Sequence, residues 1–213
     1  YGNMLLKLTN FFLPRYNLEN NFRQILAKYP QEAPIMKNVL ILSSSPRQGS
    51  NSDLLCDEFL RGALVAGHAV QKIRLSDLKL NPCLACDYCL SHDCKCVQND
   101  GMQEIFPALK AADVIVLASP VYFHSINAQL KMVFDRTYST HPSYTDKEFY
   151  FLFTSAADSD VVRDGALAGF RSWLECLPGA VEKGYVWGKG LSERGAAATS
   201  SAMREAYDLG TTV

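Results

Sequence analysis

The sequence predicts a doubly wound α/β protein, with one parallel sheet of five strands in the order 2-1-3-4-5 and helices on both faces. Two observations lead to this fold class. From residue 36 onward, short apolar runs alternate with segments whose apolar residues recur every three or four positions, which is typical of βαβ units. The chain of 213 residues is also 48% apolar, enough for one sizeable core.

The predicted strands are apolar runs, and they fall at residues 39–42, 69–75, 113–118, 149–153 and 180–186. The first run is apolar throughout, which indicates a strand covered on both faces. The predicted helices lie between the strands and after the last one, at residues 52–66, 102–111, 126–138, 161–177 and 192–209. Pro107 falls inside the second helix and predicts a kink or a short first turn there.

A polar loop, SSSPRQGSNS at residues 43–52, joins the first strand to the first helix. It carries hydroxyl groups, the guanidinium of Arg47 and the flexible Gly49, and Asn51 and Ser52 are good N-cap residues. The free N–H groups and the dipole at a helix N-terminus favour an anion, so this loop is a candidate phosphate site, although a plain surface turn has a similar composition. The GxGxxG and GxxxxGK[ST] patterns are absent from it, which favours the single phosphate of a mononucleotide.

The stretch after the third strand, residues 119–124, reads SPVYFH. Pro120 stiffens the exit from the strand, and Tyr122 and Phe123 offer the flat apolar wall that a tricyclic ring needs, although loop aromatics also pack into cores. In doubly wound sheets the ligand lies beyond the carboxyl ends of the strands. We therefore expect the site at residues 43–52, 119–124 and 154–160.

Five of the seven cysteines fall within residues 83–96, in the run Cys83, Cys86, Cys89, Cys94, Cys96. So compact a run indicates metal, cluster or redox chemistry rather than a disulfide scaffold. Its spacing suits an iron–sulfur cluster, whereas zinc ligands usually come in separated pairs; free thiols are the third alternative. Cys56 and Cys176 stand alone in predicted helices and are expected to pack as small apolar side chains.

Charge and hydropathy argue against two classes of partner. The net charge is −1 and the basic residues are scattered, which gives no indication of nucleic-acid binding. No apolar run approaches the roughly 18 residues of a membrane span, and we recognise no signal peptide, so a cytoplasmic protein is expected. Residues 1–35 look separate from residues 36–213. They form a predicted arm with a short amphipathic helix at residues 18–28, which either packs on its own domain or reaches another subunit.

Three segments together resemble the NAD(P)H-dependent FMN reductase family, most closely its iron–sulfur flavoprotein branch: SSSPRQGSNSDLL, the cysteine run, and VIVLASPVYFHSINAQLKMVFDRTY. The resemblance covers about residues 36–213 and implies a flavodoxin-like fold. Because the family's first loop binds the FMN phosphate, it implies phosphate contacts here from Ser45, Arg47, Ser50, Asn51 and Ser52, with Ser44 where Gly is usual. A family motif against the isoalloxazine ring implies ring contacts from Pro120, Val121, Tyr122 and Phe123. We add Thr154, at the end of the fourth strand, to the expected FMN contacts.

Two further matches concern structure and metal. The family's LK…DR stretch corresponds to Leu130, Lys131, Asp135 and Arg136, which we interpret as mainly structural. The iron–sulfur branch has a compact C-x2-C-x2-C and a fourth cysteine a few residues later, which implies a [4Fe–4S] cluster on Cys83, Cys86, Cys89 and Cys96. Cys96 is preferred as the fourth ligand because KCVQND is similar to the family's usual context, and Cys94 is the alternative.

The resemblance implies an FMN oxidoreductase in which NAD(P)H reduces bound FMN, which then reduces a small acceptor such as a flavin or quinone. An electron-transfer protein with FMN and [4Fe–4S], reduced by ferredoxin, is the alternative, and a non-enzymatic binding domain is a third hypothesis that the intact first loop disfavours. The flavin carries the reactivity, and His124 is either a proton relay beside the ring or a hydrogen-bonded loop histidine. The family likeness further implies a homodimer or homotetramer.

Overall fold

The computed structural model describes residues 35–213, in which Met36–Val213 form one compact unit. The helix predicted at residues 18–28 lies outside the described residues. Within the described part of the chain, no helix is both long enough and apolar enough to cross a membrane.

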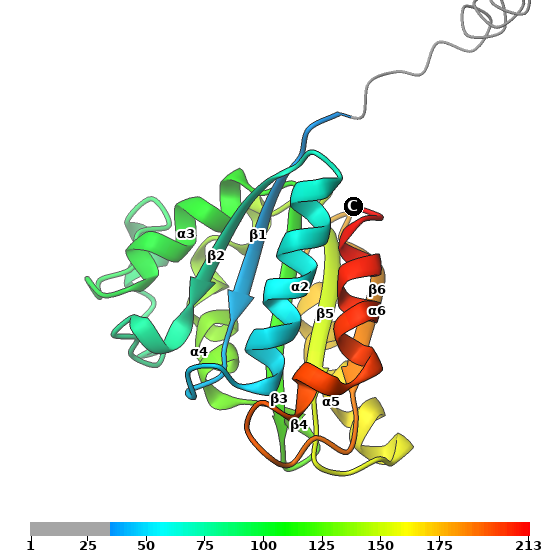
Figure 1. Cartoon of the computed structure of the whole chain (residues 1–213). Helices are drawn as coiled ribbons and strands as arrows, with labels where there is room; N and C mark the ends of the chain where they lie inside the picture. Colours follow the sequence, from blue (N-terminus) through cyan, green and yellow to red (C-terminus); the bar gives the residue numbers. More distant parts are fainter. Residues whose placement is uncertain (1–34) are drawn as a thin grey trace, which may run out of the picture. The chain divides into compact units, whose positions relative to one another are not determined.

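One sheet runs through the unit, and its parallel strands follow the order β2-β1-β3-β5-β6 (Figure 1). The strands are β1 Asn38–Ser43, β2 Ala69–Arg74, β3 Val114–Tyr122, β4 Ser125–Ile126, β5 Glu148–Thr154 and β6 Val181–Gly188. Counted over the parallel strands this is the predicted order 2-1-3-4-5, so the predicted flavodoxin-like fold is confirmed. The sixth strand, β4, was not predicted: it is two residues long and pairs antiparallel with the end of β3.

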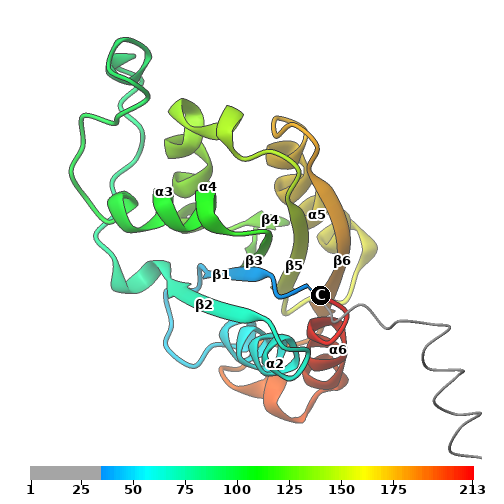
Figure 2. The same cartoon turned by 90° about the horizontal axis from the view of Figure 1, so that it is seen from above.

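Helices cover both faces of the sheet, with α2 and α6 on one side and α3, α4 and α5 on the other (Figure 2). Their bounds are α2 Asn51–Val65, α3 Met102–Ala111, α4 Ala128–Arg136, α5 Asp160–Leu174 and α6 Ser201–Gly210. Pro107 is accommodated within α3, which keeps the predicted bounds.

Strand residues alternate between two buried clusters, one on each face of the sheet. In β1, Leu40 and Leu42 pack into the cluster under α3, α4 and α5, whereas Val39 and Ile41 pack under α2 and α6. All four are at most 2% exposed, because a parallel strand covered on both faces has no solvent side. The uninterrupted apolar run in the sequence therefore has a direct physical cause.

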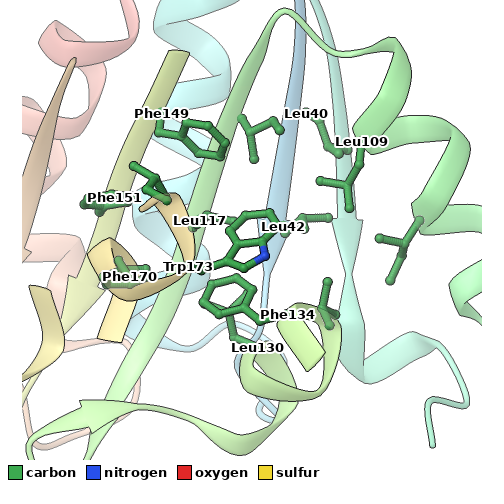
Figure 3. Packing of buried hydrophobic residues seen from close by; sticks show 14 of the residues in the cluster. Leu40, Leu42, Leu109, Leu117, Leu130, Phe134, Phe149, Phe151, Phe170 and Trp173 are labelled. Atoms are coloured by element: carbon green, nitrogen blue, oxygen red, sulfur yellow. The ribbon is translucent and has the colours of Figure 1, made fainter. Parts of the chain in front are cut away.

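Trp173 of α5 lies at the centre of the first cluster (Figure 3). Its ring stacks on Phe134 at 4.4 Å between centroids and meets the edge of Phe149 at 5.9 Å. Its buried Nε1 donates to Thr137 Oγ1 at 3.0 Å, so the polar end of the indole is satisfied. These contacts fix α4 and the turn after it against β5 and α5.

The bounds of several predicted elements are wrong. The helix predicted at residues 161–177, for example, ends at Leu174. The third strand continues to Tyr122 rather than ending at residue 118, because it pairs with β4 and, at Pro120, with Thr154 of β5. The helix predicted at residues 126–138 begins at Ala128, after an N-cap at Asn127, and its last turn is a 3₁₀ turn, Thr137–Ser139. The helix predicted from residue 192 begins at Ser201, because Gly195 adopts φ +83° and a separate 3₁₀ turn, Ala196–Thr199, precedes it.

Two glycines of α5 allow this helix to pack directly on the β3–β4 hairpin. A Cβ placed on Gly165 would lie 2.1 Å from the carbonyl oxygen of His124, which is far inside contact distance. One turn later, a Cβ on Gly169 would approach side-chain atoms of Ile126 and Ser125 at 3.2 Å. Gly165 therefore determines where the hairpin backbone lies, while Gly169 meets groups that can move.

We expect Gly165→Ala to lower the free energy of unfolding by roughly 1–3 kcal/mol, since the new methyl group must displace backbone. Gly169→Ala is the matched control. It adds the same methyl group on the same helix face, and side-chain adjustment keeps its cost under about 1 kcal/mol. Urea unfolding of the two variants measures the difference, and equal stability would contradict the packing described here.

Candidate functional site

Three segments are joined by hydrogen bonds at the carboxyl edge of the sheet. Ser44, after β1, donates its hydroxyl to the carbonyl of Ala118 in β3 at 2.6 Å. Asn127 donates its side-chain amide to the carbonyl of Ser44 at 2.7 Å, and its backbone N–H donates to Ser119 Oγ at 2.9 Å. This buried network holds the first loop, the end of β3 and the start of α4 in one arrangement.

The first loop ends at the N-terminus of α2, as the phosphate hypothesis requires. Ser50 is the N-cap, and its hydroxyl accepts from the N–H of Asp53 at 3.4 Å. Gly49 has φ +62°, a conformation that other residues adopt only at a cost, and it turns the chain into the helix. Ser45 is buried and its Oγ accepts from the N–H of Arg47 at 3.3 Å, while the Arg47 side chain is exposed. A tight turn thus places polar groups around a helix N-terminus.

Ser52 carries the clearest sign of a missing partner in this loop. The residue is 1% exposed, and its Oγ has no hydrogen-bond partner among the described residues. An unsatisfied buried hydroxyl costs about 1–3 kcal/mol, so native structures rarely leave one without a reason. A phosphate oxygen at the N-terminus of α2 would satisfy it.

Asn51 has a structural task that its sequence context did not indicate. Its amide donates to the carbonyls of Leu191 at 3.2 Å and Glu193 at 2.8 Å, and its Oδ1 accepts from the N–H of Ala197 at 3.0 Å. These bonds tie the segment after β6 to the first loop, and they engage the side chain that was predicted to contact phosphate.

The same segment brings Arg194 to the first loop. A Cβ on Gly49 would lie 3.8 Å from Arg194 Nη2. Sequence reasoning missed this second guanidinium beside Arg47, because residues 192–200 were predicted to be helical and therefore to lead away from the site. Its only local signal is its place in a glycine-containing run, GKGLSERG.

Asp53, in the first turn of α2, is a buried carboxylate held by groups from two strands. Its Oδ1 accepts from Ser43 Oγ at 2.7 Å and pairs with Lys72 Nζ at 2.8 Å, and Arg74 Nε lies 3.8 Å from Oδ2. Burial by itself raises the pKa of Asp53, but the hydrogen bonds from Lys72 and Ser43 and the two positive charges outweigh it and lower the pKa. The first helical turn is therefore tied to β1 and β2 by an ionised group.

The residues predicted as a ring wall form a hairpin rather than a loop. Pro120, Val121 and Tyr122 belong to β3, and Thr154 lies opposite Pro120 on the neighbouring strand, so the structure brings these predicted residues together. Phe123 and His124 form the turn, at φ +48° and +61°. Positive φ at both central positions is the geometry of a type I′ turn, which normally selects Asn-Gly.

The turn residues are also unusually exposed. The exposed fraction of Phe123 is 102%, that of Tyr122 is 41%, and His124 is exposed as well. A large aromatic residue held out of the core in a costly backbone conformation is the kind of feature that gathers at functional sites.

Four of the five clustered cysteines line one pocket. They are Cys83, Cys86, Cys89 and Cys96, the four predicted ligands, and Cys94 is not among the lining residues. Cys94, the predicted alternative to Cys96, is nevertheless close to this set, because its N–H donates to the carbonyl of Cys89 at 3.1 Å. Within residues 35–213, no group of three or more His, Cys, Asp or Glu side chains is arranged to hold a metal ion.

A buried ion pair holds this cysteine segment to α4. Arg136 donates from Nη1 to Asp100 Oδ2 at 2.7 Å and from Nη2 to Asp100 Oδ1 at 3.0 Å, and its Nη1 also reaches the carbonyl of Asn81 at 2.8 Å. Asp100 also accepts from the N–H of Asn81 at 3.0 Å. Burial alone raises the pKa of Asp100, but the Arg136 contact and the backbone N–H groups lower it overall. Both ends of the segment are thus fixed to one side chain.

The two isolated cysteines differ. Cys56 is fully buried in α2, where burial raises the pKa of its thiol to about 12, so it is a packed apolar residue as predicted. The prediction for Cys176 is wrong: it follows the end of α5 and is exposed.

These features are those of a flavodoxin-like α/β protein with polar loops at the carboxyl edge of its sheet. The family model described as NADPH-dependent FMN reductase matches residues 37–181, and the chain belongs to this family. A solved NAD(P)H:quinone oxidoreductase from Methanothermobacter marburgensis shares the fold, with a TM-score of 0.61 at 15% identity over 83% of this chain and 96% of that one.

Two curated relatives carry the description iron–sulfur flavoprotein. One, from Archaeoglobus fulgidus, is 33% identical over 73% of this chain and 70% of its own length. Another, from Methanocaldococcus jannaschii, is 42% identical over 46% of this chain, and the match spans about half (51%) of that relative. The predicted resemblance to this family and its iron–sulfur branch is confirmed.

We expect the stability of the protein to fall in acid partly through Asp53. Because its pKa is lower in the folded than in the unfolded chain, where it is about 3.9, its contribution is complete above that value and is lost as the pH falls through the folded pKa. Asp53→Asn should therefore destabilise most near neutral pH, and the difference from wild type should shrink below about pH 4. Urea unfolding between pH 3 and 7 measures it, with Ser43→Ala as an intermediate case; a constant difference would exclude this role.

Proposed function

We propose that the carboxyl edge of the sheet binds FMN and that the protein is a flavin-dependent oxidoreductase. The observation that carries this proposal is the unpartnered hydroxyl of Ser52, buried at the N-terminus of α2 in a loop that matches the family's phosphate loop. One phosphate group at that point satisfies the hydroxyl and meets the positive end of the helix dipole. The proposed phosphate contacts are Ser45, Arg47, Ser50 and Ser52, with Arg194 beside them and Asn51 acting through the segment after β6.

The hairpin is the proposed support for the flavin ring. Pro120 and Tyr122 lie on the same face of β3, and Thr154 lies opposite Pro120 on β5. Val121 instead packs against the buried cluster under α3, α4 and α5, and the exposed Phe123 lies in the turn that follows. Bound FMN would supply the redox chemistry, accepting two electrons from a reduced nicotinamide and passing them to an acceptor. The protein has to hold the ring, leave one face open and provide donors at its polar edge; His124 is a proposed donor beside it.

For the overall reaction we propose NAD(P)H as reductant and a small acceptor such as a flavin or a quinone. The family description supports the nicotinamide, and the fold neighbour from M. marburgensis is described by both nicotinamide and quinone. We also propose a homodimer or homotetramer, since Phe123 and Tyr122 expose apolar surface that a neighbouring subunit would cover.

A second function is favoured by the cysteine pocket: electron transfer through FMN and a [4Fe–4S] cluster, with ferredoxin as electron donor. Four thiols line one pocket, and a cubane binds each of its cysteines at a different iron, so its ligands surround a volume rather than converge on one ion. The segment also contains Ala85, Asp87, Asp93 and Cys94 at φ values from +49° to +60°. Each non-glycine residue in that region costs roughly 1–2 kcal/mol, which supports a segment shaped for a ligand.

One set of measurements tests both functions on the full chain. A flavin absorbance spectrum shows whether FMN is bound, and iron and acid-labile sulfide assays of protein purified without oxygen show whether the cluster is present. Steady oxidation of NADPH with added FMN or quinone supports the reductase, whereas reduction by ferredoxin with little nicotinamide activity supports the carrier. A colourless protein that refuses FMN would overturn both.

Arg47→Ala should weaken FMN binding by roughly 10- to 100-fold, since a hydrogen bond to a charged group contributes about 1.5–3 kcal/mol. Gln48→Ala, on the adjacent exposed residue, is the matched control and should bind FMN as wild type does. Riboflavin lacks the phosphate, so its affinity should be the same for all three proteins. Fluorescence titration measures these constants; an Arg47→Ala protein that retains FMN would show that the phosphate lies elsewhere.

A further inference from the structure

Arg136 contacts the cysteine pocket as well as Asp100. Its Nη2 donates to Cys96 Sγ at 3.4 Å, within the range for a hydrogen bond to sulfur, and the residue is 3% exposed. Its guanidinium is held in place, because it also donates to the carboxylate of Asp100 and to the carbonyl of Asn81. A fixed cation therefore borders the pocket at the cysteine that follows the other three ligands in sequence.

Two residues that line this pocket have buried polar atoms without a partner in the described part of the chain. Among the described residues four buried side-chain atoms lack a hydrogen-bond partner, and two of them, Arg136 Nε and Ser139 Oγ, belong to residues that line the cysteine pocket. Ser139 is 7% exposed and lies in the 3₁₀ turn that directly follows α4. Both groups are hydrogen-bond donors, and their residues share the pocket lining with four thiols and with four other polar side chains, Asp87, Tyr88, Gln98 and Tyr138.

A backbone donor reaches another of these sulfurs. The N–H of Ala85, at φ +49°, donates to Cys83 Sγ at 3.4 Å. Hydrogen bonds to the sulfurs of an iron–sulfur cluster are one of the means by which a protein sets its reduction potential, because they stabilise the more negative, reduced form. Donors of this kind have no comparable use around a set of free neutral thiols, which accept hydrogen bonds weakly.

We propose that Arg136 and Ser139 are the positioning and potential-setting donors of a [4Fe–4S] cluster on Cys83, Cys86, Cys89 and Cys96. This inference rests on the second proposed function. Arg136 orients Cys96 as fourth ligand, and its remaining N–H and the Ser139 hydroxyl donate to the sulfurs of the bound cluster. Cys94, outside the pocket, is not a ligand. The LK…DR stretch then has a task at the metal site beyond the structural one first assigned to it.

The ligand assignment is tested by iron and sulfide content after anaerobic reconstitution of the full-length protein. Cys96→Ser should lose the cluster while Cys94→Ser keeps it, and FMN retention reports folding in both. The reverse result, or loss in both variants, would overturn the assignment of Cys96.

The donor role is tested by the reduction potential of the cluster, measured by a redox titration followed by electron paramagnetic resonance. Ser139→Ala removes one hydroxyl and is expected to shift the one-electron equilibrium toward the oxidised form by up to tenfold, which is 59 mV. Arg136→Lys keeps the charge but removes the forked donors, and should shift the potential in the same direction. Ser143→Ala is the matched control, because its exposed hydroxyl donates to the carbonyl of Thr140.

Different outcomes would contradict the donor role and the proposed electron-transfer function. If the wild-type protein takes up neither iron nor sulfide, both the proposed cluster and this inference are wrong. That result does not bear on FMN binding, which the absorbance spectrum tests separately. A cluster whose potential is the same in wild type, Ser139→Ala and Arg136→Lys would overturn the donor role alone. Ser139→Ala leaves the Arg136–Asp100 pair intact, so the test stands even where Arg136→Lys fails to fold.

Discussion

The buried ion pair between Arg136 and Asp100 is the constraint on which the cysteine segment depends. The residues between β2 and α3 contain little regular structure, and this segment is exposed over most of its length. A single guanidinium at the end of α4 binds the chain where the segment begins, at Asn81, and where it ends, at Asp100. Breaking such a pair costs about 3–5 kcal/mol because one buried charge is left without its partner.

A second constraint operates at the other end of α4. Asn127 caps the helix and also holds Ser44 and Ser119, so the polar loop and the aromatic hairpin cannot move independently. Gly165 adds a steric limit, because α5 leaves no space at this point between itself and the hairpin backbone. Packing of this kind explains how Phe123 and His124 are kept in a turn that their sequence does not favour.

The sequence was a good guide wherever one physical effect dominates. Burial on both faces makes β1 and most of β3 apolar, so the strands and their order were predictable, and the polar first loop was recognisable at its helix N-terminus. The sequence was a poor guide where tertiary contacts determine the structure. Pro120 reads as the end of a strand, yet β4 and β5 extend that strand to Tyr122. Ser139 carries no local signal, and Arg194 has only the glycine-containing run around it, since they reach their neighbours through the turn after α4 and through Asn51.

Helix α4 also has a consequence for how this protein can change in evolution. Its nine residues run from the Asn127 cap beside the polar loop to Arg136 beside the cysteines, a length of roughly 14 Å. One inserted residue would rotate Arg136 by about 100° about the helix axis and turn it away from Asp100 and Cys96. Insertions and deletions should therefore be rare within α4. The length of α4 is therefore constrained by the polar loop at its N-terminus and by the ion pair and the cysteines at its C-terminus.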